Sequence, residues 1–282
     1  MKNGFLVIVR GGGDMATATV HRLWKAGFRV LALEAERPAA IRRQVSISEA
    51  VYEGRACVEG MTAVRIDSPD QMQAVFDAGQ VPLLVDPEGK SIESLEPDVV
   101  VDAIIAKQNL GTRINMAPMT IALGPGFEAG KDVHAVIETM RGHNLGRIIT
   151  GGSAKPNTGV PGSIGGYAAE RVIHAAQAGV LRNRHAIGDY VQQGETIAKI
   201  ETEDGSVAVP ASITGLIRGL IRDGYPVTEG FKIADIDPRR EEYVNCFTIS
   251  DKARCIAGSV LELVCSQYMK KTNGEHADEN GI

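Results

Sequence analysis

The chain has 282 residues, of which 44% are hydrophobic and 23% charged, and its formal net charge is -5 at pH 7. This length fits two or three compact domains, and the ordinary globular composition excludes disorder as a global description. Because nucleic-acid binding depends on clustered lysine and arginine, the acidic balance also argues against a nucleic-acid partner.

The first half of the sequence predicts strands that alternate with helices. An apolar strand at 5–9 leads through a glycine turn into a helix at 14–26 and a second strand at 29–33. The pattern continues with a helix at 69–78 and with apolar runs at 63–66, 82–85, 99–105 and 120–123. Such alternation is typical of a parallel sheet. We therefore expect an α/β fold class, with a Rossmann-like parallel-sheet domain over residues 1–165.

The turn after the first strand is the strongest candidate binding site. It reads Gly11, Gly12, Gly13, Asp14, Met15, Ala16, which fits the dinucleotide fingerprint G-x-G-x-x-A between a strand and a helix. Gly11 would allow the tight turn, Gly13 the approach of a phosphate, and Ala16 close packing of helix on strand. Glu34 ends the second strand, where an acidic side chain accepts hydrogen bonds from ribose hydroxyls. The alternatives are a turn that simply needs glycine and an ordinary solvated Glu34, and Asp14 is a poor neighbour for an anion.

A second candidate follows the strand at 120–123. Gly124, Pro125 and Gly126 come at the carboxyl end of that strand, where open α/β sheets bind ligands, although a plain turn explains them equally well. Arg141, Lys155 and Asn157 could add contacts to an anion, but each by itself is more often a solvated side chain. The glycine-rich stretch 151–166 is expected to be a long loop, either a linker or a lid.

The second half of the chain contains an internal repeat. Val191-x-x-Gly194-x-x-Ile197-Ala198-x-Ile200-Glu201 recurs as Val227-x-x-Gly230-x-x-Ile233-Ala234-x-Ile236-Asp237. Alternating apolar runs separated by glycine turns predict a small all-β module at 185–238, made of two similar halves. We expect a connecting helix at 166–184, a C-terminal helical segment at 239–269 that packs on the body, and a flexible tail at 270–282.

Several kinds of site have no signal in the sequence. The six histidines and four cysteines show no metal-ligand spacing, so we predict no metal site. No nucleophile elbow, Walker loop or pair of catalytic carboxylates is present, so no catalytic residue is named and the question of enzymatic activity stays open. The first apolar run is only five residues long, too short for a leader or a membrane span, and we expect a cytoplasmic protein without a membrane partner.

Taken together, these segments resemble the YqeB-type family of accessory proteins for selenium-dependent molybdenum hydroxylases, whose Rossmann portion is similar to that of XdhC maturation factors. The resemblance extends from Val7 to about Val264. It is most specific in residues 7–16 (VIVRGGGDMA), 101–107 (VDAIIAK) and 121–127 (IALGPGF). It implies a maturation role, with a molybdenum hydroxylase apo-enzyme as partner and a nucleotide, a dinucleotide such as NAD, or molybdopterin as the small-molecule cofactor.

Residues 185–237 also resemble the barrel-sandwich hybrid of biotinyl and lipoyl carrier domains. Carriers are modified on a hairpin lysine, whereas no lysine occurs between Ile200 and Phe231, so we expect neither biotin nor lipoate. Two other functions are kept beside the maturation role: an NAD-dependent oxidoreductase, and a protein-docking scaffold with a vestigial nucleotide fold. The sequence leaves open whether the chain forms a homo-oligomer.

Overall fold

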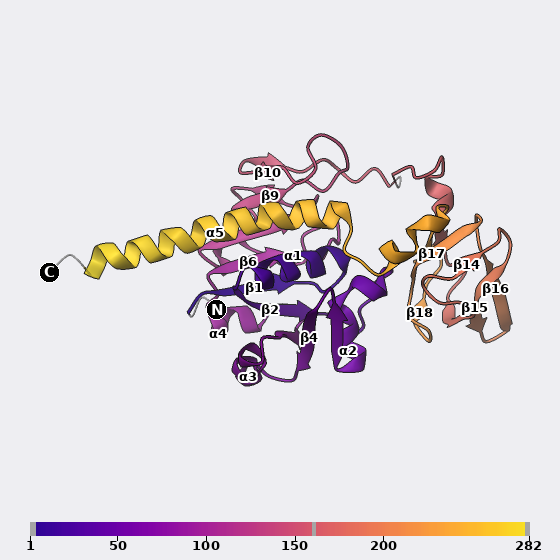
Figure 1. The fold of residues 1–282 in the computed structure, drawn as a ribbon, viewed down its shortest axis with the longest axis horizontal. Helices are drawn as coiled ribbons and strands as arrows, with labels where there is room; N and C mark the ends of the chain where they lie inside the picture. Colours follow the sequence, from indigo (N-terminus) through magenta and orange to yellow (C-terminus); the bar gives the residue numbers. More distant parts are fainter. Residues whose placement is uncertain (1–3, 160–161, 280–282) are drawn as a thin grey trace. The chain divides into compact units, whose positions relative to one another are not determined.

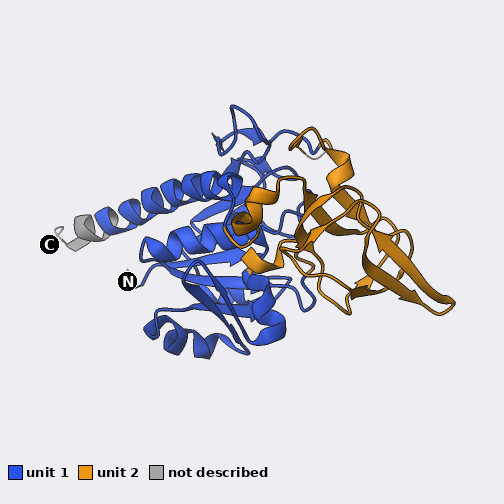
Figure 2. Ribbon diagram, turned by 45° about the vertical axis from the view of Figure 1, so that its right-hand side comes forward, with its two compact units in different colours: residues 1–38, 47–157, 249–282 blue, residues 39–46, 158–248 orange. Residues whose placement is uncertain are grey.

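The computed structural model describes residues 4–159 and 162–279, which form two compact units. Unit 1 comprises residues 1–38, 47–157 and 249–282, and unit 2 comprises residues 39–46 and 158–248 (Figure 2). Residues 39–46 therefore belong to the same unit as the β-rich second half. The C-terminal segment, from residue 249 onward, belongs to unit 1, as the N-terminal segment does.

Unit 1 is built on a nine-stranded mixed sheet (Figure 1). Its strands, in spatial order, are β10 (Ile148–Ile149), β9 (Ala135–Ile137), β7 (Met119–Leu123), β6 (Val99–Asp102), β1 (Leu6–Arg10), β2 (Arg29–Glu34), β5 (Val81–Val85), β4 (Met61–Ile66) and β3 (Arg55–Val58). Seven neighbouring strands run parallel, while β10 and β3 run antiparallel at the two edges.

The two faces of this sheet are covered differently. Helix α1 (Asp14–Lys25) packs against the long helix α5 (Asp251–Glu279) on one face. The other face carries the short helices α3 (Met72–Asp77) and α4 (Ser91–Leu95), whose Phe76 and Ile92 join the strand residues Ile8, Leu31 and Val100 in one buried cluster. Burying these apolar side chains is the main stabilising contribution to such a layered structure. A further short helix, α2 (Ala50–Glu53), precedes β3.

Unit 2 consists largely of two antiparallel four-stranded sheets around a shared apolar core. One sheet contains β12 (Val172–His174), β19 (Lys232–Asp237), β17 (Gly215–Leu220) and β14 (Tyr190–Val191). The other contains β16 (Gly205–Pro210), β15 (Thr196–Thr202), β13 (Gly179–Asn183) and β18 (Pro226–Val227). A separate two-stranded sheet in unit 1 pairs β11 (Gly152–Ser153) with β8 (Glu128–Ala129).

The internal repeat explains why unit 2 has two similar halves. In each copy a two-residue strand ends in a valine, a glycine with positive φ makes the turn, and a long strand follows. The glycines are Gly194 (φ 85°) and Gly230 (φ 75°), a conformation that costs little only for glycine. The apolar positions of both copies are fully buried in the common core.

The fold class expected from the sequence, a Rossmann-like parallel sheet with a barrel-sandwich module, is wrong, whereas the C-terminal helix expected with it is present as α5. The sheet of unit 1 is mixed, β5 lies between β2 and β4, and several additional sheets are antiparallel. One cause is the turn Glu59-Gly60, in which both residues have positive φ, because such a turn joins β3 and β4 as a hairpin. This hairpin interrupts the strand-helix alternation on which the expectation was based.

Two further expectations fail at the level of single elements. The connecting helix expected at 166–184 is replaced by a 3-10 turn (Ala169–Arg171) and the strands β12 and β13. The tail expected from residue 270 is helical as far as Glu279, with residues 280–282 outside the described part. Lys271 explains part of this longer helix, because its ammonium lies 2.7 Å from a carboxylate oxygen of Asp98 in unit 1. Residues 160 and 161 of the expected 151–166 loop also lie outside the described part.

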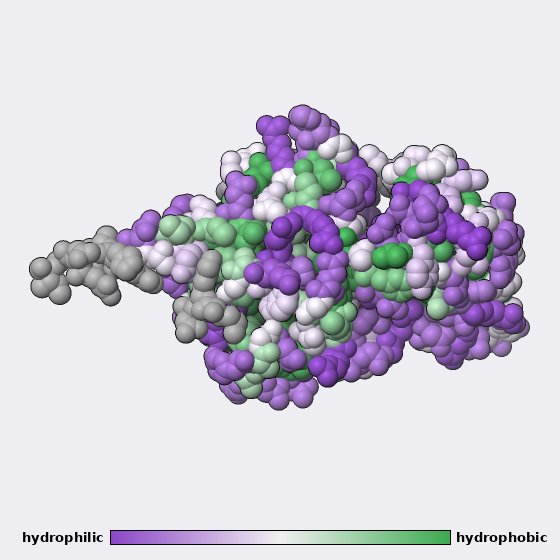
Figure 3. All heavy atoms as spheres, in the orientation of Figure 1, coloured by the Kyte–Doolittle hydropathy of each residue, from purple (hydrophilic) through white to green (hydrophobic). Residues whose placement is uncertain are grey.

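Figure 3 shows hydrophilic residues over most of the displayed face, with apolar residues in separate patches. Large apolar side chains with substantial exposure are dispersed along the chain, at Leu110, Tyr167, Tyr190, Val207, Tyr243, Val244 and Met269. Scattered exposure of this kind is normal for a folded protein and by itself indicates no binding surface.

Candidate functional site

The strand order of unit 1 defines one position that favours ligand binding. β1 lies between β2 and β6 and is parallel to both, so the chain builds the sheet first on one side of β1 and later on the other. Ligands of open α/β sheets bind outside the carboxyl ends of the strands at such a switch of direction. We call this position the switch point. The residues that follow β1 and β6 are therefore the first candidates for a site.

The three glycines after β1 have different structural roles. A Cβ atom on Gly11, whose φ is 106°, would lie 2.9 Å from the carbonyl oxygen of Ala103. A Cβ on Gly12 would lie 3.0 Å from both the Glu34 carboxylate and the Ser48 amide nitrogen. Gly13 has an ordinary φ of -66°, and a Cβ there would meet nothing within 4 Å. Packing thus explains the first two glycines, whereas Gly13 faces open space at the N-terminus of α1.

Glu34 clamps this turn from the end of β2. One carboxylate oxygen accepts a hydrogen bond from the Gly12 amide at 2.6 Å, and the other accepts one from the Ala35 amide at 2.7 Å. Burial raises the pKa of the Glu34 carboxyl, while the two amide donors act in the opposite direction. Glu34 therefore lies beside the glycine turn, as its position in the sequence predicts, and it already holds the turn in place through backbone contacts.

The loop at 103–108 is strained and lies against the glycine turn. Ile105 and Lys107 have φ values of 61° and 63°, a conformation that is rare for any side chain and an outlier for the β-branched Ile105. The loop is held at both ends, because Ala103 leaves no room for a side chain at Gly11 and Gln108 leaves none at Gly126. Strain of this kind persists only where surrounding packing enforces it, and it concentrates at functional sites.

A buried polar network lies directly beneath the switch point. Arg10, with 1% of its surface exposed, donates hydrogen bonds to the Thr112 hydroxyl and to the carbonyl oxygens of Pro87 and Leu110. The Thr112 hydroxyl in turn donates to Asp102 at 2.6 Å. Burial raises the pKa of Asp102, although Thr112 and Arg10 oppose that shift. The network ties the ends of β1 and β6 to the segment that follows the 103–108 loop.

Lys252 adds a cation near the N-terminus of α1. It is the second residue of α5 and is partly buried, and its charge interacts with Asp14, Glu138 and Arg141. Burial, with a smaller contribution from Arg141, lowers the pKa of Lys252, while the carboxylates of Asp14, Glu138 and Asp251 act against this shift. The combination of an amine and a helix N-terminus is suited to an anionic group, although Asp14 and Glu138 already neutralise part of the positive potential.

The other predicted site residues are only partly brought together. The Arg141 guanidinium forms a two-bond ion pair with Asp251, at 3.0 and 3.1 Å, so it is already engaged. Lys155 reaches the area through its backbone amide, which donates to buried Glu138 at 2.9 Å. Asn157 is exposed, and the described residues provide no contact that joins it to the switch point.

The second glycine group lies at the same sheet edge and is required for packing. A Cβ on Gly124 would lie 2.6 Å from the Thr139 hydroxyl, and one on Gly126 would lie 2.7 Å from the Gln108 backbone. Both glycines have positive φ, and Pro125 between them is partly buried. Met15 and Ala16 belong to the first turn of α1, and the Met15 amide donates to Asp14. Contact of these residues with a ligand stays a prediction.

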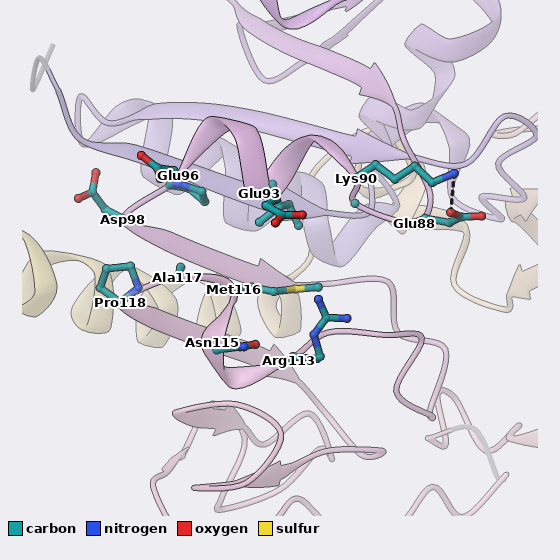
Figure 4. A pocket seen from close by; sticks show the side chains of 13 residues that line it. Glu88, Lys90, Glu93, Glu96, Asp98, Arg113, Asn115, Met116, Ala117 and Pro118 are labelled. Carbon is teal, nitrogen blue, oxygen red and sulfur yellow. Dashed lines mark ion pairs between the residues drawn. The ribbon is translucent and has the colours of Figure 1, made fainter.

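A groove of about 820 Å³ lies beside α4 on the opposite face from α1. Figure 4 shows Glu93 and Glu96 on the α4 side and Arg113 and Asn115 on the side of the 113–118 segment. None of the residues that the sequence predicts as a site lines this groove. It is nevertheless connected to the switch point, because Arg113 directly follows Thr112 of the buried network. We keep the glycine turn as the candidate site because the strained backbone and the open helix N-terminus coincide there.

Sequence reasoning missed three parts of this site: the 103–108 loop, the network of Arg10, Asp102 and Thr112, and Lys252. Asp102 was the available signal, because it is a carboxylate inside the apolar run predicted at 99–105, and the structure ends β6 there, so the loop lies at the carboxyl end of the strand. Lys252 had no comparable signal, since only the tertiary packing of α5 brings it near α1.

Two classes of feature are absent from the described residues. Among them, no three histidine, cysteine, aspartate or glutamate side chains are grouped so that they could hold a metal ion. No helix in the part of the chain that the structure describes is both long and apolar enough to cross a membrane.

The sequence is 51% identical over 257 residues to the Escherichia coli (strain K12) protein named uncharacterized protein YqeB. The alignment covers 91% of this chain and 47% of that protein, so the chain spans about half the length of the curated relative it matches. This similarity supports the resemblance to the YqeB-type family. No family model matches the sequence.

The solved structures that are similar to this chain have low sequence identities and low TM-scores. They include the ectoine utilization protein EutE (DoeB) from Ruegeria pomeroyi, with 10% identity and a TM-score of 0.26, covering 82% of this chain and 85% of that one. An aspartoacylase family protein from Mesorhizobium loti (10%) and a succinylglutamate desuccinylase/aspartoacylase from Rhodobacter sphaeroides (14%) both have TM-scores of 0.28, covering 83% of this chain and 85% of theirs. TM-scores this low carry no argument about fold or activity.

Proposed function

We propose that unit 1 binds a nucleotide-containing or molybdopterin cofactor at the switch point, and that the protein serves the maturation of a selenium-dependent molybdenum hydroxylase. Both ligand classes carry a phosphate group, which a helix N-terminus can bind through its backbone amides. The ligand would lie over Gly13 at the start of α1, beside the 103–108 loop.

The observation that carries the proposal is the open space in front of Gly13. Gly11 and Gly12 are glycines because a side chain would collide with backbone atoms, but no such reason exists at Gly13. Its φ is also available to any residue. A position that the fold does not require to be glycine, at a helix N-terminus, fits a requirement for close approach of a ligand to the backbone.

Two further features support a site here. Lys252 supplies a partly buried amine near Asp14, at the beginning of α1. The positive φ values of Ile105 and Lys107 store strain in the loop next to Gly11. Strained loops at the carboxyl edge of a sheet commonly position ligand-binding groups.

The maturation role rests on the motifs shared with the YqeB-type family and on the 51% identity to the Escherichia coli protein. Within this proposal unit 2 has a docking task, because the segment between Ile200 and Phe231 lacks the lysine that carrier domains modify. The hydroxylase apo-enzyme would be the partner that unit 2 contacts.

The experiment compares ligand stabilisation of the wild-type protein with that of Gly13→Val. Melting temperatures are recorded against NAD, NADP, ATP, CTP and molybdopterin, because a bound ligand stabilises the folded state by mass action. Gly13→Val should fold, since nothing lies within 4 Å of the new Cβ, yet its branched side chain would obstruct the phosphate. The matched control is Gly258→Val in α5 of the same unit, where a Cβ also meets nothing within 4 Å and the backbone is helical.

We expect one ligand class to raise the wild-type melting temperature and that rise to vanish in Gly13→Val but persist in Gly258→Val. An equal rise in a folded Gly13→Val protein would place the ligand elsewhere and refute the proposed site. Stabilisation by NAD together with hydride transfer to a small carbonyl substrate would replace the maturation role by an oxidoreductase. If no ligand stabilises the wild type, a docking scaffold accounts for the chain better.

A further inference from the structure

Strand β16 forms the outer edge of its sheet in unit 2. In the described residues it pairs only with β15, so the peptide groups on its other side have no strand partner. Five of its six residues are exposed, including Val207 at 39%. An open strand edge of this kind is a template on which another strand can form hydrogen bonds.

The other edge strands of the nine-stranded sheet and of the two four-stranded sheets are protected against pairing with a further strand. Each is shorter than β16. Three of them also carry a feature that hinders pairing: an arginine in β3, a proline in β18 and an irregular register in β12. β10 and β14 have only two residues each. Short strands, charges, prolines and bulges are the means by which proteins prevent pairing at an edge.

β16 has few of these protections. Residues 205–209 read Gly-Ser-Val-Ala-Val, without a charged side chain, and their register with β15 is regular up to Val209. Only the C-terminal end of β16 is protected against pairing, by Pro210 and by the register shift opposite it in β15. The edge is therefore open along five residues, in a molecule that shields its other edges.

We propose that β16 pairs antiparallel with β16 of a second copy of this chain. A two-fold axis at Val207 would place Val207 opposite Val207 of the second copy and Ser206 opposite Ala208 of the second copy, so only small uncharged side chains would meet. The closed two-fold arrangement extends each four-stranded sheet into one continuous sheet across both copies.

The charges at the ends of β16 favour this orientation over a parallel one. Glu203 and Asp204 precede the strand and are exposed. In the antiparallel arrangement they extend toward Pro210 and Ala211 of the second copy, which are uncharged. A parallel arrangement would bring the acidic pairs of both copies side by side, and like charges at that distance repel.

The test combines oligomeric state with a charge swap. Sedimentation equilibrium of the full chain over a range of concentrations should give a mass rising from 30.0 kDa toward twice that value. Val207→Lys and Val207→Glu should each weaken the dimer by about fivefold or more, because the two copies then carry like charges on neighbouring strands. Mixing the two variants should restore the association, since opposite charges then face each other.

Val244→Lys is the matched control, because Val244 is 66% exposed in the same unit but lies in a 3-10 segment and not in a strand. Circular dichroism melts confirm that each variant folds. The control should dimerise like the wild type. A wild-type mass of one chain at every concentration, a dimer unaffected by either Val207 substitution, or a dimer lost in Val244→Lys would each overturn the proposal.

Discussion

Replacing Gly11 and Gly13 separately by alanine tests the different roles that the structure gives them. At Gly11 the new Cβ would lie 2.9 Å from the Ala103 carbonyl oxygen, in a backbone with φ of 106°. Backbone strain and the displacement of a rigid neighbour should together cost about 2–4 kcal/mol of unfolding free energy. At Gly13, the N-cap of α1 with φ of -66° and no atom within 4 Å, the change should stay within about 1 kcal/mol.

The assay is urea unfolding followed by tryptophan fluorescence. Trp24 is the single tryptophan of the chain, and it lies in α1, where its indole nitrogen donates to the Gly79 carbonyl oxygen at 2.8 Å. Its emission therefore reports the unfolding of unit 1 alone. Equal unfolding free energies for the two variants, or a larger loss at Gly13, would refute the assignment of these glycines to packing and to ligand approach.

Three other substitutions probe the surroundings of the glycine turn. Because the folded-state pKa of Glu34 lies above its ordinary value of 4.5, its carboxyl contributes stability at low pH that is lost as pH rises through the folded pKa. The unfolding free energy of Glu34→Gln, measured by urea titration, should therefore rise relative to that of the wild type as the pH rises through the folded-state pKa of Glu34. A difference between the two proteins that does not change with pH would contradict the raised pKa. Arg10→Met should lower the unfolding free energy by about 3–5 kcal/mol, because buried Asp102 loses its cation, and a loss below about 1 kcal/mol by Trp24 fluorescence would contradict this. Lys252→Met should reduce the ligand-induced rise in melting temperature, whereas Lys270→Met, exposed on the same helix, should not; equal effects would remove Lys252 from the site.

Local patterns predicted many elements of unit 1 correctly, because hydrophobic periodicity and turn chemistry depend on residues that are close in the sequence. The strand before Gly11, helix α1 and strand β2 all follow from apolar periodicity and the glycine turn. The β3–β4 hairpin was missed because its signal, Glu59-Gly60, lies in a segment that lacks strong alternation. That one hairpin is enough to make the sheet mixed.

The candidate site was predictable only where its residues follow a strand directly. Gly11 and Glu34 end neighbouring strands, so sequence order already places them at one sheet edge. Arg141 illustrates the limit of such reasoning, because its pairing with Asp251 depends on the return of α5 to unit 1. Contacts between segments more than a hundred residues apart leave no trace in local periodicity.

Native mass spectrometry of freshly purified protein tests the central claim most directly, because it detects a cofactor that is retained at the switch point without prior choice of ligand. We expect a mass adduct matching a nucleotide-containing compound or molybdopterin in the wild type, and its loss in folded Gly13→Val. An adduct that persists in Gly13→Val, or a wild-type protein that carries no adduct and gains none on incubation with these cofactors, would contradict this expectation.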